Sequence, residues 1–121
     1  MALFYVIYFK REFRLRGLPE LTKEEIQDLN ENSTISNTTI PEMLERLKNS
    51  TLKYQTKITH GDSYLHIKPK NAFSNWGDSI IIEKLEGENH FSIKAKRRIL
   101  SPDVHYFINA LNIKELKEML D

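Results

Sequence analysis

The chain has 121 residues, of which 40% are hydrophobic and 29% are charged, and these proportions are typical of one soluble globular domain. Its 18 basic and 17 acidic residues leave a net charge of +1, which argues against a general nucleic-acid binder because such proteins carry a clear basic excess. The absence of cysteine excludes disulfides, thiolate metal sites and a cysteine nucleophile, and it suits a cytoplasmic protein.

The N-terminal segment is an apolar run over residues 2–9 followed by the basic residues Lys10, Arg11, Arg14 and Arg16. The run is shorter than the roughly 20 residues of a membrane span, and a signal peptide would carry its charge before the apolar run. We therefore predict a strand over residues 2–16. A membrane-proximal segment is an alternative, because aromatic residues beside lysine and arginine are typical of a membrane interface, and a partner-binding strand is another.

Two short helices are predicted next. Thr22 and Glu25 have the spacing of a capping box, so a helix begins after Thr22 and turns an apolar face inward at Ile26 and Leu29. Residues 30–39 are rich in asparagine, serine and threonine and are predicted to form a polar loop. Thr39 then caps a second helix that ends near Asn49.

The middle of the chain is predicted to form strands. Apolar and polar residues alternate from Leu52 to Ile58, a turn follows at residues 60–63, and the next strand stops at Pro69. Residues 71–78 form a loop that carries Trp76.

A hairpin and a C-terminal helical region complete the chain. The hairpin runs from Ser79 to Ile99 around the turn at residues 87–89, and one or two short helices follow up to Leu120. The predicted fold is a single α+β domain over residues 1–121, with an antiparallel meander of four to six strands and helices packed on one face.

The hairpin's second strand carries the sharpest concentration of charge. Alternation places Lys94 and Lys96 on its outer face, and Arg97 and Arg98 follow at the strand end. Together with Lys68 and Lys70 they are candidates for a patch that binds an anionic group or an acidic partner. The alternative is a solvated sheet face whose charge protects an edge from aggregation.

Trp76 completes the predicted partner-binding set of Lys94, Lys96, Arg97, Arg98 and Trp76, because a tryptophan in a loop can anchor an interface. The alternative for Trp76 is that it covers one end of the core. No spacing of histidine with acidic residues predicts a metal site or a catalytic constellation. We therefore expect no enzyme, no cofactor, no metal and no catalytic residue.

From about Glu42 to Leu120 the order of features resembles the DUF1499-like families of uncharacterised bacterial domains, which are often attached to membrane helices. The resemblance rests on residues 93–99 and 106–113, where Asn109 and Asn112 fit asparagines of the family. Ala95, His105 and Phe107 depart from the family's serine, aspartate and glycine. The resemblance implies an α+β fold and a position near a membrane, and it implies no reaction.

These observations predict a non-catalytic protein-interaction module, located in the cytoplasm or at the inner face of a membrane. An immunity or inhibitor protein, which blocks another protein by surface complementarity, is one form of this prediction. We expect a protein partner rather than nucleic acid, with membrane contact through residues 2–16 as an alternative. The alternative function is a small-molecule-binding domain with a pocket between sheet and helix, gated by Trp76.

Overall fold

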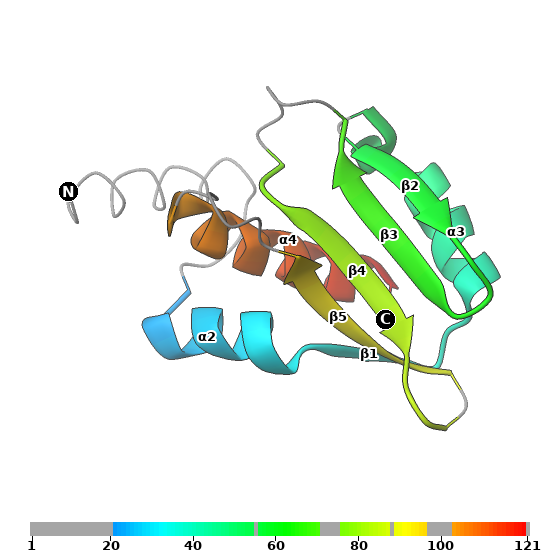
Figure 1. Ribbon diagram of the computed structural model, residues 1–121, viewed down its shortest axis with the longest axis horizontal. Coiled ribbons are helices and arrows are strands. Elements are labelled where there is room, and N and C mark those ends of the chain that lie inside the picture. The colour runs from blue at the N-terminus through cyan, green and yellow to red at the C-terminus, as the bar shows by residue number, and fades with distance from the viewer. Residues whose placement is uncertain (1–20, 55, 71–75, 88, 97–102, 121) are drawn as a thin grey trace.

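The computed structural model describes residues 21–54, 56–70, 76–87, 89–96 and 103–120, so the predicted strand over residues 2–16 lies outside the described residues. Five strands form one open antiparallel sheet, and two helices, α3 (Ile40–Lys48) and α4 (Asp103–Leu120), lie behind it in the view of Figure 1. This arrangement confirms the predicted α+β class, with its antiparallel sheet and its helices on one face.

The helices are α2 (Lys23–Asn32), α3 (Ile40–Lys48) and α4 (Asp103–Leu120), and a 3₁₀ turn, η1, covers Thr51–Tyr54. The strands are β1 (Thr34–Ser36), β2 (Thr56–His60), β3 (Tyr64–Pro69), β4 (Ser79–Lys84) and β5 (His90–Lys96). The order across the sheet is β1-β5-β4-β3-β2, so β2 to β5 form the expected meander and β1 joins its far edge. The hairpin of β4 and β5 is confirmed, and the C-terminal region is one helix.

The capping box predicted for α2 is present with both of its hydrogen bonds. The Thr22 backbone N–H donates to Glu25 Oε1 at 3.0 Å, and the Glu25 N–H donates to Thr22 Oγ1 at 3.1 Å. These bonds satisfy two of the backbone donors that a helix start leaves free. The cap at Thr39 is also confirmed, because Thr39 Oγ1 accepts from the Glu42 N–H at 3.3 Å.

The polar loop predicted for residues 30–39 is wrong. Helix α2 continues to Asn32, and residues 34–36 form the edge strand β1. Ile35, an apolar residue in a polar stretch, lies opposite Phe91 of β5 and is fully buried. Its burial outweighs the weak strand preference of the residues around it.

The strand predicted from Leu52 begins later than expected, because residues 51–54 form η1. Local hydrogen bonds from hydroxyl groups favour this turn. Thr56 Oγ1 donates to the Leu52 carbonyl at 2.7 Å, and Ser50 Oγ accepts from the Leu52 N–H at 3.3 Å. Such bonds compete with the ladder of a sheet.

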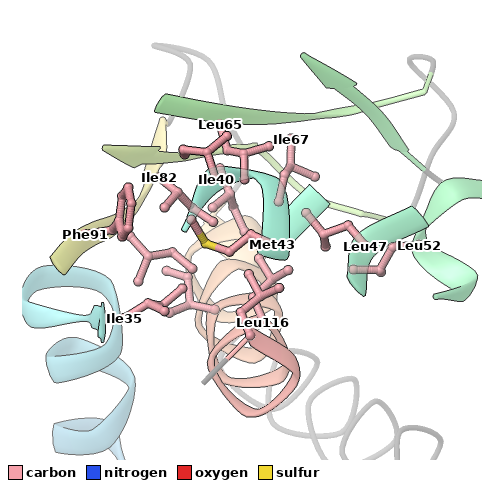
Figure 2. Packing of buried hydrophobic residues seen from close by; sticks show 14 of the residues in the cluster. Ile35, Ile40, Met43, Leu47, Leu52, Leu65, Ile67, Ile82, Phe91 and Leu116 are labelled. Carbon is pink, nitrogen blue, oxygen red and sulfur yellow. The ribbon is translucent and has the colours of Figure 1, made fainter. Parts of the chain in front are cut away.

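The main core lies between the sheet and the helices (Figure 2). Leu65, Ile67 and Ile82 point from the sheet towards Met43 of α3 and Leu116 of α4, and each is fully buried. A smaller cluster joins Leu21 and Ile26 of the α2 region to Ala110 and Leu111 of α4. This packing occupies one face of the sheet, so alternate side chains of every strand point to the opposite face.

Candidate functional site

The candidate site is the face of the sheet that points away from α3 and α4, which is the face seen in Figure 1. Burial alternates along the middle of β3, β4 and β5, where the core-facing positions are buried and the outer positions are exposed or half-buried. No described helix packs on this outer face. Its chemistry is therefore set by the side chains at the alternate positions.

Four exposed lysines, Lys57, Lys68, Lys94 and Lys96, gather on this face, and we call them the lysine face. The register places Lys57 opposite Lys68 and Ser79 opposite Lys96. Lys68 is the neighbour of Ser79, because the pair Ile67–Ile80 continues by one residue. One row therefore runs from Lys57 through Lys68 and Ser79 to Lys96.

The spacing of strands gives the size of the lysine face. Adjacent strands lie about 4.8 Å apart, so the row spans about 14 Å from β2 to β5. Lys94 lies in the next row, opposite Ile81, and is about 7 Å along the strand from Lys96. The backbone positions of the four lysines are thus held within one small area of the sheet.

The charge of this area is not neutralised within the described structure. Like charges directly opposite each other on neighbouring strands repel, as Lys57 and Lys68 do. Glu83 is the acidic residue that strands β1 to β5 place on this face, and no ion pair joins it or any other described residue to the four lysines. The exposed first turn of α2 is acidic instead, at Glu24 and Glu25. The near-zero net charge thus conceals a local positive patch.

His66 lies inside the lysine face, in the row between Thr59 of β2 and Ile81 of β4. Its Nε2 atom is buried and has no hydrogen-bond partner among the described residues. Burial lowers the pKa of His66, and the nearby charges of Lys68 and Lys96 lower it further. The imidazole is therefore neutral at pH 7, and its pKa depends on the charges around it.

The predicted site residues have different outcomes. Lys94 and Lys96 occupy the outer face of β5 as expected, and Lys68 joins them across β4. Arg97 and Arg98 lie outside the described residues. Lys57 and His66 were missed as members of the site, although the alternation along their strands carries the signal that each points outward.

The prediction that Trp76 anchors a partner is wrong. Its side chain is 2% exposed and belongs to the main core cluster. Trp76 therefore covers the core, which was the alternative prediction for this residue. Asn112 Nδ2 donates to the Trp76 carbonyl. Asn109 accepts from the Asp78 N–H at 3.1 Å and donates to Asp78 Oδ2 at 3.0 Å. These buried hydrogen bonds fasten residues 76–78 to α4.

Other kinds of site find less support in the described part of the chain. There, no group of three or more histidine and acidic side chains could hold a metal ion. A shallow groove lies between α2 and α4, lined by Leu29, Lys114, Lys117 and Glu118. None of the described helices combines the length and the apolar character needed to cross a membrane.

Comparison with known proteins adds no relative: no family model, no curated protein and no solved structure matches the chain. The resemblance to the DUF1499-like families therefore stays a prediction.

Proposed function

We propose that this protein is a non-catalytic interaction module, and that the lysine face binds an acidic surface of a partner protein. The observation that carries the proposal is the set of four lysines held on an open sheet face without an acidic partner among the described residues. Positive and negative surfaces that match in this way speed association and select the partner.

The rigidity of the sheet supports a binding role. The lysines stand on neighbouring strands whose opposite face packs into the core, so their Cα positions are fixed before a partner arrives. A preorganised surface loses less conformational entropy on binding than a mobile one. An immunity or inhibitor role and a membrane-proximal position are narrower forms of this proposal.

The test is a charge reversal at the centre of the face. We expect Lys68→Glu combined with Lys96→Glu to abolish retention of the partner in affinity capture from cells that make the protein. The two substitutions replace attraction by repulsion over the middle of the row, and like charges across an interface cost several kcal/mol. The midpoint temperature of thermal unfolding should change by only a few degrees, since both side chains are exposed.

A matched control is Lys23→Glu combined with Lys84→Glu, which changes the net charge equally. Neither residue belongs to the lysine face. Lys23 is the first residue of α2, and Lys84 is the last residue of β4, where alternation assigns it to the opposite face of the sheet. Captured proteins that are retained by this control and lost from the first variant support the proposal. Equal retention by both variants, or no retained protein with the wild-type chain, would overturn it.

A further inference from the structure

The row of residues from Lys57 to Lys96, which we call the lysine row, contains a gap between two of its long side chains. Ser79 has a short, half-buried side chain, and it lies between the long side chains of Lys68 and Lys96 on the two neighbouring strands. These lysines are two strand spacings apart, or about 10 Å at the backbone. Their flexible stems can bring both ammonium groups over the serine from opposite sides, and the hydroxyl offers a donor from below.

We propose that Lys68, Ser79 and Lys96 form a seat for one phosphoryl group, carried by a phosphorylated side chain of the partner protein. This inference rests on the proposed function, because the partner supplies the group. The donors approach from three directions, which matches a tetrahedral oxyanion. Lysine binds phosphate as a point charge, whereas planar carboxylates are matched by the fork of arginine.

The amount of unpaired charge also favours a phosphoryl group over a carboxylate. A phosphorylated side chain carries about −1.5 to −2 charges at pH 7. Lys57 and Lys94 flank the seat and add to its field, and the described residues supply no ion pair to either. A dianion therefore gains more from this face than a single carboxylate does.

The chemistry around the seat favours a protein over nucleic acid or a membrane. Single-strand binders add aromatic platforms beside the phosphate contacts, but the exposed Tyr54 lies on η1, and Tyr64 pairs with Glu83 away from the seat. The row holds one gap rather than a track of phosphate sites. A single phosphoryl group on a protein surface fits this geometry.

His66 supplies a readout that a purely structural lysine cluster would not give. Among the described residues, the charged and titratable groups that face it are Lys57 from β2, Tyr64 and Lys68 from β3, Glu83 from β4, and Lys94 and Lys96 from β5. An anion in the seat offsets the repulsion from Lys68 and Lys96 that lowers the pKa of His66. Binding therefore raises this pKa, and the complex takes up protons at pH values close to it.

The first experiment titrates the whole chain with inorganic phosphate at constant ionic strength and follows it by NMR. We expect saturable shifts of the Lys68, Ser79 and Lys96 amides and a rise in the pKa of the His66 ring. Sulfate should give the same rise, and it stays a dianion throughout the His66 titration. Acetate, a carboxylate, should bind about tenfold more weakly or less, a difference of about 1.4 kcal/mol.

Variants locate the seat. Lys68→Gln combined with Lys96→Gln should weaken phosphate binding about tenfold or more, as expected for losing charge-assisted hydrogen bonds. Lys23→Gln combined with Lys84→Gln should leave it unchanged. The seat is refuted if the shifts grow without saturation, if acetate binds as tightly as phosphate, or if both variant pairs lose affinity equally.

The second experiment identifies the source of the group. A peptide with one phosphoserine should bind about tenfold more tightly than the same peptide without the phosphate, and the Lys68 and Lys96 variant should remove that difference. Tighter binding of a single-stranded oligonucleotide, or of vesicles containing phosphatidic acid, would overturn the assignment to a protein.

The two proposals fail separately. If the seat binds no phosphate but the Lys68 and Lys96 reversal still releases a captured protein, the seat is wrong and the interaction module stands. If phosphate and phosphopeptide bind at the seat and no protein is captured, the seat stands and the proposed function is wrong.

Discussion

Gly77 and Gly87 have almost the same φ angle but very different surroundings. Their φ angles are +99° and +100°, a region that residues with a side chain rarely adopt. A Cβ atom at Gly77 would lie 3.0 Å from Asn109 Oδ1 and 3.0 Å from Ile108 Cγ2, whereas one at Gly87 would meet no heavy atom within 4 Å. Substituting each glycine therefore separates the destabilisation caused by the backbone angle from the destabilisation caused by the close contact.

We expect Gly87→Ala to lower the free energy of unfolding by about 1–2 kcal/mol through its backbone angle. Gly77→Ala should lower it by at least about 1 kcal/mol more, because it also presses on Asn109. Urea denaturation of the two variants measures the difference. Equal midpoints would show that the contact at Gly77 relaxes without cost.

Asn109 is a second test at the scale of one residue. Its amide makes two hydrogen bonds to Asp78, and both residues are almost completely buried. Asn109→Ala removes both bonds, and we expect a loss of about 2 kcal/mol or more in the free energy of unfolding. Asn32→Ala is the control, because its bond to Asp28 is exposed, and it should change stability by less than about 0.5 kcal/mol. Similar losses in the two variants would contradict the importance of the buried pair.

At the scale of one element, the start of α2 depends on Thr22. We expect Thr22→Val to lower the free energy of unfolding by about 1 kcal/mol, because it removes the hydroxyl that accepts from the Glu25 N–H. Thr59→Val, at an exposed strand position, is the control. Urea denaturation measures both, and equal stabilities would contradict the role of the cap.

The same cap makes the start of α2 sensitive to pH. The backbone N–H of Thr22 lowers the pKa of Glu25, and the Thr22 side chain lowers it further. The resulting stabilisation is present above the ordinary pKa of 4.5 and is lost as the pH falls through the lowered folded value. In the Thr22→Val chain, an NMR titration should find the pKa of Glu25 closer to its ordinary value.

The elements also show what the sequence could predict. Thr22 and Thr39 act on backbone groups three residues away, so both caps could be predicted from local spacing. Ile35 becomes part of a strand only because β5 lies beside it, and no neighbour in sequence reveals that pairing. Lys94 and Lys96 could be assigned to an outer face from alternation along one strand. Their meeting with Lys57 and Lys68 depends on the order of four strands, which local patterns do not contain.

At the scale of the whole molecule, the arrangement of charge matters more than its sum. The acidic first turn of α2 and the lysine face belong to different parts of the fold, and the net charge of +1, from 18 basic and 17 acidic residues, reveals neither of them. At physiological ionic strength such fields reach only about 8 Å. The lysine face therefore acts on a partner at close range, and its binding should weaken as salt is added.

Strand β1 is short, but its position affects how the chain folds during synthesis. It pairs with β5, which lies far along the chain, whereas every other pairing in the sheet joins consecutive strands. Helix α2 likewise packs on α4. The elements before α3 therefore leave the ribosome long before their partners, and closing such long loops is slow. Chaperones that meet the nascent chain would find Ile26 and Ile35 exposed until β5 and α4 have emerged.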